Sequence, residues 1–352
     1  MKQVNFNLSC WMEDKGPDME IVISSRVRAA RNIKGHTFPC LASEEETAAV
    51  LEIISSVTVA KEDFAEFYYW PMEQISDLEK QVLVEKHLIS PFLARESKYG
   101  ALFLRQDEAV SIMINEEDHL RIQAILPGLQ LEEAWQEAGL YDDLLEGELE
   151  YAFDEHFGYL TACPTNMGTG LRASVMLHLP ALIMSGQINR FLGALSQVGL
   201  TVRGLYGEGT EIVGNLVQVS NQVTLGQSEE EIIHNLYVVI RQVIEQEQNV
   251  RQTLLDRNRA NLADKAYRAL GLLKYAQVMS SHEAIGLISD LRLGYDLGLI
   301  KDVDYKLLNE LLVIIRPGCL QLLATRELNN NERNLERPAQ IKETLSRYKA
   351  VS

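Results

Sequence analysis

Five arginines stand in segments that otherwise have the apolar, β-branched character of strands: Arg26, Arg28, Arg121, Arg172 and Arg203. Arginine presents a rigid fork of N–H donors that can hold phosphate oxygens at two points. One arginine on a strand usually pairs with a surface carboxylate, but neighbouring arginines repel each other unless an anion lies between them. Five on one sheet therefore favour a face that binds a polyphosphate.

The segment Ile21–Arg28 indicates how such a face would form. Side chains alternate along a strand, so Arg26 and Arg28 share one face with Ser24. The opposite face would join the hydrophobic core. The residues expected there are Ile21, Ile23 and Val27.

Two acidic segments could complete a site. The corner Glu116-Glu117-Asp118 lies between two predicted strands, and Glu208 lies in a loop between two glycines. Carboxylates can bind a cation and act as a base, and glycines suit a loop that closes on substrate. Taken alone, the corner is more typical of a solvated turn, and the loop of an ordinary hairpin.

Cys163 ends a predicted strand just before Pro164. The simpler interpretation is a buried, inert thiol; the alternative is a thiolate whose pKa nearby arginines lower. Neither GxxxxGK[ST] nor a GxGxxG after a strand occurs in the chain, so the common nucleotide-binding loops are excluded.

The chain of 352 residues carries a formal charge of −17, from 50 acidic and 33 basic residues. A field of this sign repels nucleic acid and anionic membranes, so we expect neither as a partner. Apolar runs are too short to span a membrane, and four cysteines without a CxxC pair argue against disulfides or a zinc site. We therefore expect a cytoplasmic protein.

The first part of the chain, to about residue 225, predicts an α+β fold with a mainly antiparallel sheet flanked by helices. Turns join its strands, which are expected at Ile21–Arg28, Tyr99–Arg105, Val110–Asn115, His119–Ile125, Tyr159–Cys163, Leu171–Leu177, Leu200–Leu205 and Leu216–Ser220. Helices are expected at Glu45–Val57 and Asp77–Leu88, after Pro180, and after Ser228, which forms a capping box with Glu231.

No convincing strand follows residue 258. Helices are expected at Leu262–Gln277, His282–Tyr295, Tyr305–Ile315 and Ile341–Tyr348, with a loop at Asn329-Asn330-Asn331. We therefore predict two domains, residues 1–257 with the α+β fold and residues 258–352 with an all-α fold.

Four segments, in this order, resemble the ATP:guanidino phosphotransferases, the family of the creatine and arginine kinases: Ile23–Arg28, Asn115–Arg121, Cys163–Arg172 and Arg203–Glu208. The resemblance implies a phosphagen-kinase-like catalytic domain that uses ATP and Mg²⁺. Within this family the chain is most similar to the bacterial protein arginine kinases. The first arginine motif starts near residue 24, so we expect no helical N-terminal domain and an open site that admits an arginine on a protein.

The tail segment Arg333-Asn334-Leu335-Glu336-Arg337-Pro338 is similar to the phosphoarginine-binding motif Arg-Asp-x-x-Arg-Ala of those kinases. Asn334 replaces the aspartate and Pro338 the alanine. The resemblance implies an allosteric phosphoarginine site here, while a charged loop before the last helix is an equally good interpretation.

For the nucleotide, the resemblance implies that the five arginines clamp the phosphates and that His87 lies near the adenosine. Gln218 stands where some members carry aspartate, and we expect it to tune a nucleotide contact. Magnesium would be held mainly by phosphates and water. The residues expected at ATP are Ser24, Ser25, Arg26, Val27, Arg28, His87, Arg121, Arg172, Ala173, Ser174, Val175, Met176, Arg203, Gly204, Leu205, Tyr206, Gly207 and Glu208.

A guanidinium is protonated near neutrality, so its nitrogens are poor nucleophiles until a base removes a proton. The resemblance implies that Glu116 or Glu117 acts together with Glu208. We favour Glu117 as the base and Glu116 as an orienting group or a contact to magnesium-bound water. Cys163 would be a thiolate that orients the guanidinium.

The leading hypothesis is a kinase that phosphorylates arginine side chains of proteins and marks them for regulation or degradation under stress. The alternatives are a kinase of a free guanidino metabolite and a non-catalytic phosphoarginine-binding adaptor. The resemblance implies as partners protein substrates with exposed arginine, a zinc-binding activator protein, a heat-shock repressor and a Clp unfoldase–protease. The apolar helical tail predicts a homodimer.

Overall fold

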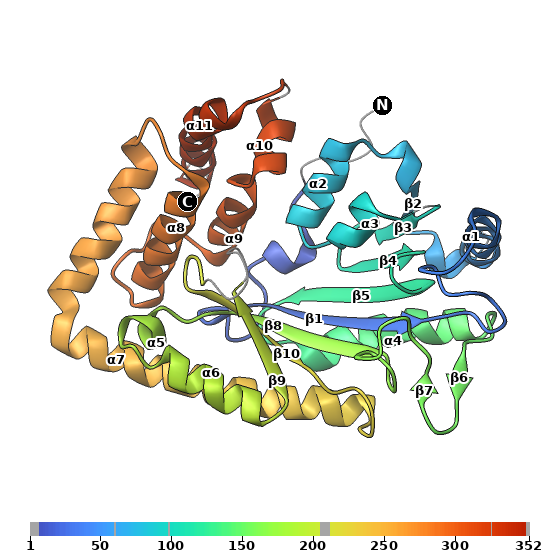
Figure 1. Cartoon of the computed structure of the whole chain (residues 1–352). Helices are drawn as coiled ribbons and strands as arrows, with labels where there is room; N and C mark the ends of the chain where they lie inside the picture. Colours follow the sequence, from blue (N-terminus) through green and yellow to red (C-terminus); the bar gives the residue numbers. More distant parts are fainter. Residues whose placement is uncertain (1–6, 60, 98, 205–211, 325, 350–352) are drawn as a thin grey trace.

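A single antiparallel sheet organises the fold (Figure 1). The computed structural model describes residues 7–59, 61–97, 99–204, 212–324 and 326–349. The eight strands run in the order β2-β3-β4-β5-β1-β8-β10-β9, and every pairing is antiparallel, as predicted. They are β1 (Val22–Arg31), β2 (Phe67–Pro71), β3 (Ala101–Arg105), β4 (Val110–Ile114), β5 (Leu120–Pro127), β8 (Leu171–His178), β9 (Leu200–Gly204) and β10 (Leu216–Asn221).

Helices cover both faces of the sheet and form two hydrophobic cores. The first core is closed by α1 (Glu44–Thr58), α4 (Leu131–Glu146), α5 (Pro180–Met184), α6 (Ile188–Gln197) and the first half of α7 (Glu229–Tyr275). The second core is closed by η1 (Cys10–Met12), η3 (Met72–Gln74), α2 (Asp77–Glu85), α3 (Pro91–Arg95), the second half of α7, α8 (Ser281–Asp296), α9 (Tyr305–Ile314), α10 (Pro317–Ala324) and α11 (Asn330–Lys349). The short η2 (Glu62–Phe64) precedes β2.

Strand β1 confirms the alternation predicted for its arginines, with one correction. Val27 lies in the first core, on the face opposite Arg26 and Arg28. Ile23 was expected beside Val27 but lies in the second core, because the pairing with β8 shifts by one residue between Val22 and Ser24. An extra residue in a strand reverses the side-chain alternation at that point.

Several element predictions are wrong in extent. Tyr159–Cys163 is not a strand; β7 (Gly158–Tyr159) ends at Tyr159, pairs with β6 (Phe153–Asp154) and forms an isolated bridge with Gly168. The helix that begins at Pro180 is interrupted at Gly186, whose φ of +70° breaks it into α5 and α6. Strand β2 and helix α4 were not predicted.

Helix α7 runs through the predicted domain boundary. Its backbone leaves the helical conformation at Asn258 (φ −136°, ψ 31°), which bends the chain there (Figure 1). The helices beyond the bend nevertheless share the second core with the sheet. Within the described residues, no single helix could cross a membrane; α9 and α10 reach the needed length and apolarity only as a pair bent by 87°.

Candidate active site

The register of the sheet brings the predicted arginines together on one face. Arg28 on β1 lies directly opposite Arg172 on β8 and opposite Gln123 on β5, two residues from Arg121. On the far side of β8, Gln218 of β10 lies opposite Arg203 of β9. Since directly paired residues point to the same face of a sheet, arginines from four strands face one side.

The same alternation narrows the residues predicted at ATP. Ser24, Ser174 and Met176 share the arginine face and line a small cavity with Arg26 and Gln218. Four others point to the opposite face: Val27, Ala173 and Val175 are buried in the first core, and the hydroxyl of Ser25 donates to the carbonyl of Gly128. Their side chains therefore do not line the cavities of the site.

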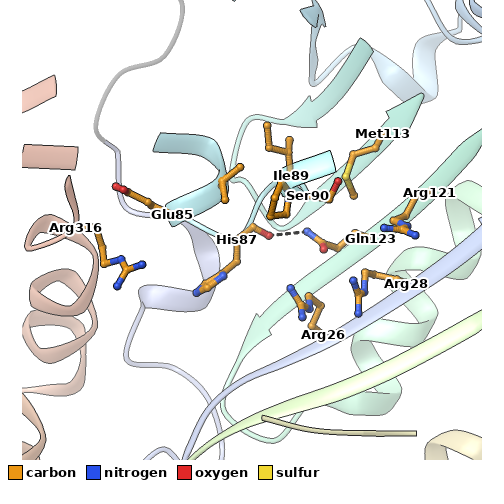
Figure 2. Close-up of a pocket in the computed structure, with 12 residues that line it drawn as sticks. Arg26, Arg28, Glu85, His87, Ile89, Ser90, Met113, Arg121, Gln123 and Arg316 are labelled. Atoms are coloured by element: carbon orange, nitrogen blue, oxygen red, sulfur yellow. Dashed lines mark hydrogen bonds between the residues drawn. The ribbon is translucent and has the colours of Figure 1, made fainter. Parts of the chain in front are cut away.

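A cavity of about 300 Å³ lies over the arginine face, between β1, β5 and the connection from α2 to α3 (Figure 2). Its basic residues are Arg26, Arg28, Arg121 and Arg316, and His87 lies between them. The remaining lining residues are Val84, Glu85, Ile89, Ser90, Pro91, Met113 and Gln123.

The arginines of this face are buried close to one another, at a cost in free energy. Burial, with the charges of Arg172 and Arg121, lowers the pKa of Arg26 to about 10. Burial and the three neighbouring arginines lower the pKa of Arg28 well below its usual value. The Nε atoms of Arg28 and Arg172 are buried without a hydrogen-bond partner among the described residues. An anion bound on this face would offset the repulsion between the buried charges and would accept hydrogen bonds from the unpaired N–H groups.

A second cavity of about 320 Å³ shares Arg28 and Arg121 with the first. It is lined by the predicted acceptor residues Glu117 and Cys163, and by Arg172. Its other lining residues are Ala30, Thr165, Asn166, Gly170 and Arg203. Arg28 and Arg121 therefore line both cavities, and the second cavity also contains the Glu117 carboxylate and the Cys163 thiol.

Arg121 holds both carboxylates of the acidic corner. Its Nη1 donates to Glu116 at 2.8 Å and its Nη2 to Glu117 at 3.0 Å. Glu116 also accepts from the hydroxyl of Ser90 at 2.5 Å, and its side chain is only 2% exposed. The side chain of Glu117 is 39% exposed, so it is the carboxylate that a ligand can reach.

The third acid of the corner, Asp118, has a structural role that sequence reasoning missed. Its Oδ1 accepts from Asn32 Nδ2 and from the backbone N–H of Ala162, both at 2.7 Å. Burial raises the pKa of this carboxyl. Asp118 thus ties the start of the Cys163 loop to Asn32, the residue that follows β1, and Cys163 Sγ lies 3.0 Å from the hydroxyl of Thr165.

His87 lies at the turn after α2 with a φ of +63°. Burial, with the charges of Arg26 and Arg316, lowers its pKa to about 3, so the ring is neutral near pH 7. Its carbonyl accepts from the side-chain amide of Gln123, which fixes the turn to β5 (Figure 2).

The predicted ATP residues that follow Arg203 are described only in part. Gly204 ends β9, while Leu205, Tyr206, Gly207 and Glu208 lie outside the described residues. The tail motif is not a loop, because α11 begins at Asn330 and contains all six of its residues, Arg333, Asn334, Leu335, Glu336, Arg337 and Pro338.

Arg337 is buried within the C-terminal helices. Its guanidinium donates to the carbonyls of Ile315 and Met279 and to Asn334 Oδ1. Pro338 removes the helical hydrogen bond to the carbonyl of Asn334, and that carbonyl accepts from the N–H of Met279 instead. Arg333 is partly exposed and donates to Asn330.

The side chains around the two cavities suit a metal ion that is held by a nucleotide rather than by the protein. Among the described residues there is no group of three or more histidine, cysteine or acidic side chains that could hold an ion. Arg121 engages the carboxylates of Glu116 and Glu117, and Glu85 accepts from the backbone N–H groups of Gly318 and Cys319.

Comparison with known proteins identifies the family. A family model described as "ATP:guanido phosphotransferase, C-terminal catalytic domain" matches residues 49–250, more than half of the chain. The chain belongs to the ATP:guanido phosphotransferase family. A second model, described as "Protein-arginine kinase McsB C-terminal domain", matches residues 259–352. The resemblance inferred from the four motifs is therefore confirmed.

Relatives within the ATP:guanido phosphotransferase family match over nearly the full length. A protein named protein-arginine kinase from Brevibacillus brevis is 54% identical over 96% of this chain and 95% of its own. A protein of the same name from Geobacillus thermodenitrificans is 50% identical over 98% of this chain and 95% of its own. Among solved structures, a lombricine kinase aligns with a TM-score of 0.60 and 25% identity over 68% of this chain and 70% of its own.

Proposed function

We propose that this protein transfers the γ-phosphoryl group of ATP to guanidinium side chains of proteins. One observation carries the proposal: a buried face of arginines separates a basic cavity from a second cavity that contains Glu117 and Cys163. A triphosphate and a guanidinium could meet at this face from opposite sides. The relatives named protein-arginine kinase, which match nearly the whole chain, support a protein as the acceptor.

The arginines would act mainly through electrostatics. Phosphoryl transfer spreads negative charge over the equatorial oxygens of the γ-phosphate, and prepositioned cations stabilise that charge. Arg28 and Arg121 line both cavities, so they are placed to contact the transferred group. Arg26, in the first cavity, would hold the neighbouring phosphates, while Arg172 lies beside Arg28 on the wall of the second cavity.

Glu117 would prepare the acceptor. Its exposed carboxylate can accept a proton from one guanidinium nitrogen. That nitrogen then forms a bond to the γ-phosphorus, while the bond between the γ-phosphorus and the leaving ADP breaks. Arg121 holds Glu117 in place and keeps Glu116 turned away toward Ser90. Cys163, on the wall of the same cavity, would orient the guanidinium without forming a covalent bond.

ATP would bind as its magnesium complex. When bound, Mg²⁺ neutralises charge on the nucleotide phosphates. Because Arg121 engages Glu116 and Glu117, the ion would be held by phosphate oxygens and water, in line with the donor set of the site.

The test is incubation with ATP, Mg²⁺ and an arginine-rich protein, followed by mass spectrometry in neutral buffer, because an N-linked phosphate is lost in acid. We expect phosphoarginine on the protein substrate. A coupled assay of ADP release with free arginine and creatine runs beside it. Turnover of free guanidines without protein phosphorylation would mean that the acceptor is a small molecule. If neither the protein nor the free guanidines were phosphorylated, the proposal that the protein is a kinase would be refuted.

The wider setting of this reaction rests on the similarity to protein-arginine kinases. From that similarity we infer a cytoplasmic homodimer that acts in the stress response and is regulated by phosphoarginine at Arg333–Pro338. A zinc-binding activator, a heat-shock repressor substrate and a Clp unfoldase–protease would be its partners. Light scattering of the purified chain tests the dimer: a mass near 80 kDa is expected, about twice the 39.7 kDa of one chain, and a monomer would contradict it.

A further inference from the structure

One wall of the ATP cavity comes from the C-terminal helices. Arg316, in the connection between α9 and α10, lines the 300 Å³ cavity together with Arg26, Arg28 and His87. Figure 2 shows Arg316 on the side of the C-terminal helices, across His87 from the β1 arginines. None of the four arginine motifs contains this residue.

The backbone on either side of Arg316 is held in place from two directions. On one side, Glu85 at the end of α2 accepts from the backbone N–H groups of Gly318 and Cys319, both at 2.8 Å. These groups belong to the first turn of α10, immediately after Arg316. On the other side, Arg337 Nε donates to the carbonyl of Ile315 at 2.9 Å. The cavity wall is thus locked both to α2 and to α11.

Gly318 permits the close approach of α10 to α2. A Cβ atom at this position would lie 2.8 Å from Gln81 Cγ and 2.9 Å from Glu85 Oε2. Contacts this short leave little room for a side chain, so the backbone of α10 at Gly318 lies directly against the side chains of Gln81 and Glu85 on α2. The backbone next to Arg316 is therefore placed by its packing and hydrogen bonds with α2.

The cavity has two distinct ends. Arg28 and Arg121 mark the end that joins the second cavity, where Glu117 and Cys163 lie. Arg316 and Glu85 mark the opposite end, beyond His87. A triphosphate whose γ-phosphate lies between Arg28 and Arg121 would place its nucleoside toward Arg316.

We propose that Arg316 binds the nucleoside end of ATP, so that the C-terminal helices supply part of the nucleotide site. This inference rests on the proposed function. The planar guanidinium can donate to ribose hydroxyls or cover the face of the adenine, and both contacts favour arginine over lysine.

The experiment is calorimetric titration of the full chain with ADP and with inorganic tripolyphosphate, each with Mg²⁺. Arg316→Ala should weaken ADP binding about 10-fold, the usual size of a lost hydrogen bond from a charged group. Arg316→Lys should recover only part of that loss. Tripolyphosphate has no nucleoside, so its affinity should change less than twofold in both variants.

Arg326→Ala is the matched control, since Arg326 belongs to the same helical region but pairs on the surface with Glu332. It should bind ADP like the wild type, and melting temperatures should show that all variants are folded. The inference is overturned if Arg316→Ala binds ADP normally, or if it loses ADP and tripolyphosphate equally. Failure of the wild type to bind ADP would instead refute the proposed function.

Discussion

The two neighbouring glutamates share Arg121 but differ in their other contacts. Arg121 binds both, while Ser90 and the backbone N–H of Glu117 also hold Glu116, which is buried. Glu117 keeps one face open to the cavity that contains Cys163. Two adjacent carboxylates thus have different environments, and only Glu117 can receive a proton from a ligand without breaking a buried hydrogen bond.

Glu117→Gln should therefore abolish most of the activity while leaving ATP binding intact. The amide keeps the shape and the hydrogen bond to Arg121 but cannot accept the proton, so kcat should fall by roughly 10²–10⁴-fold, the usual contribution of a general base. Phosphoarginine formation and ADP titration measure the two properties separately. Glu133→Gln, on the exposed surface of α4, is the control and should retain full activity. A Glu117→Gln enzyme with normal kcat would show that another group is the base.

The sequence was informative about residues whose position follows from local periodicity. Arg26 and Arg28 share a face because β1 is regular where they lie. The alternation of side chains fails at Ile23, where the register with β8 shifts. Asp118 and Arg316 could not be found this way. Their positions depend on contacts with Ala162 and Glu85, which are distant in sequence and become neighbours only through tertiary packing.

The loop from Cys163 to Gly170 carries the thiol of the site and is anchored at both ends. Asp118 binds the N–H of Ala162 at its start. At its end, the carbonyl of Thr169 accepts from Arg31 Nη1, and Gly170 adopts a φ of +65°. A Cβ at Gly170 would lie 2.6 Å from both the carbonyl oxygen of Ala30 and Arg31 Nη1.

Gly170→Ala should consequently disturb both stability and catalysis. The left-handed backbone costs a non-glycine residue about 1–2 kcal/mol, and the clash with β1 should raise the total to roughly 2–4 kcal/mol. Urea unfolding and kcat measure the effects. Gly186→Ala is the control, because Gly186 has a similar φ of +70° but nothing within 4 Å of its Cβ position. Equal losses in the two variants would mean that the contact with β1 is unimportant.

Helices with a local start signal were predicted better than those without one. Ser228 and Glu231 form the predicted capping box, and α7 begins directly after Ser228. Helix α11 was placed too late because three asparagines and Pro338 suggest a loop. Its first turn is stabilised by Asn329 and Glu332, which bond to each other's backbone N–H, and Met279 satisfies the carbonyl that Pro338 leaves free. The second of these contacts cannot be inferred from the local sequence.

The stability of the whole molecule depends on keeping buried histidines neutral. The Nδ1 of His119 accepts from the N–H of Ile33, and its Nε2 donates to the carbonyl of Thr37, each at 3.0 Å. Burial lowers the pKa of His119 to about 4, with His36 acting in the same direction and the Thr37 carbonyl opposing it. Protonation of Nδ1 would remove the bond from Ile33.

Acidification should therefore destabilise the protein through His119. The unfolded side chain, with a pKa near 6.5, binds a proton between about pH 6.5 and 4 that the folded one does not. This contribution to the free energy of unfolding is complete above pH 6.5 and decreases as the pH falls toward 4, by about 2 kcal/mol at pH 5. Urea unfolding measures this change. Between pH 7 and pH 5, the free energy of unfolding should fall by about 2 kcal/mol less in His119→Gln than in the wild type.

The control for this pH dependence is His234→Gln, on the exposed side of α7, which should show the wild-type change. Asp296 acts in the opposite direction, because burial raises its pKa to about 6. Comparing two histidine variants removes that background, since Asp296 is present in both. If His119→Gln and the wild type lost the same stability between pH 7 and 5, His119 would not be the group responsible.

The second core joins the two parts of the chain that the sequence predicts as separate domains. Trp11, Leu83 and Leu93 from the first part are fully or almost fully buried in it beside residues of α8 to α11. Polar contacts cross the same boundary, since Arg292 donates to the carbonyl of Met19 at 2.6 Å. Composition indicates where helices replace strands, but it cannot indicate that both parts share one core.

The full chain should consequently unfold as one unit. Calorimetry should give a single transition whose calorimetric and van't Hoff enthalpies agree, because neither part can lose the second core alone. A chain cut after residue 258 would expose the apolar surface around Leu83 and Leu93, and it should aggregate or lack a cooperative transition. Two separate transitions in the full chain, or a soluble and cooperatively folded 1–258 fragment, would show that the two parts are independent domains and that Arg316 reaches the ATP cavity across a mobile interface.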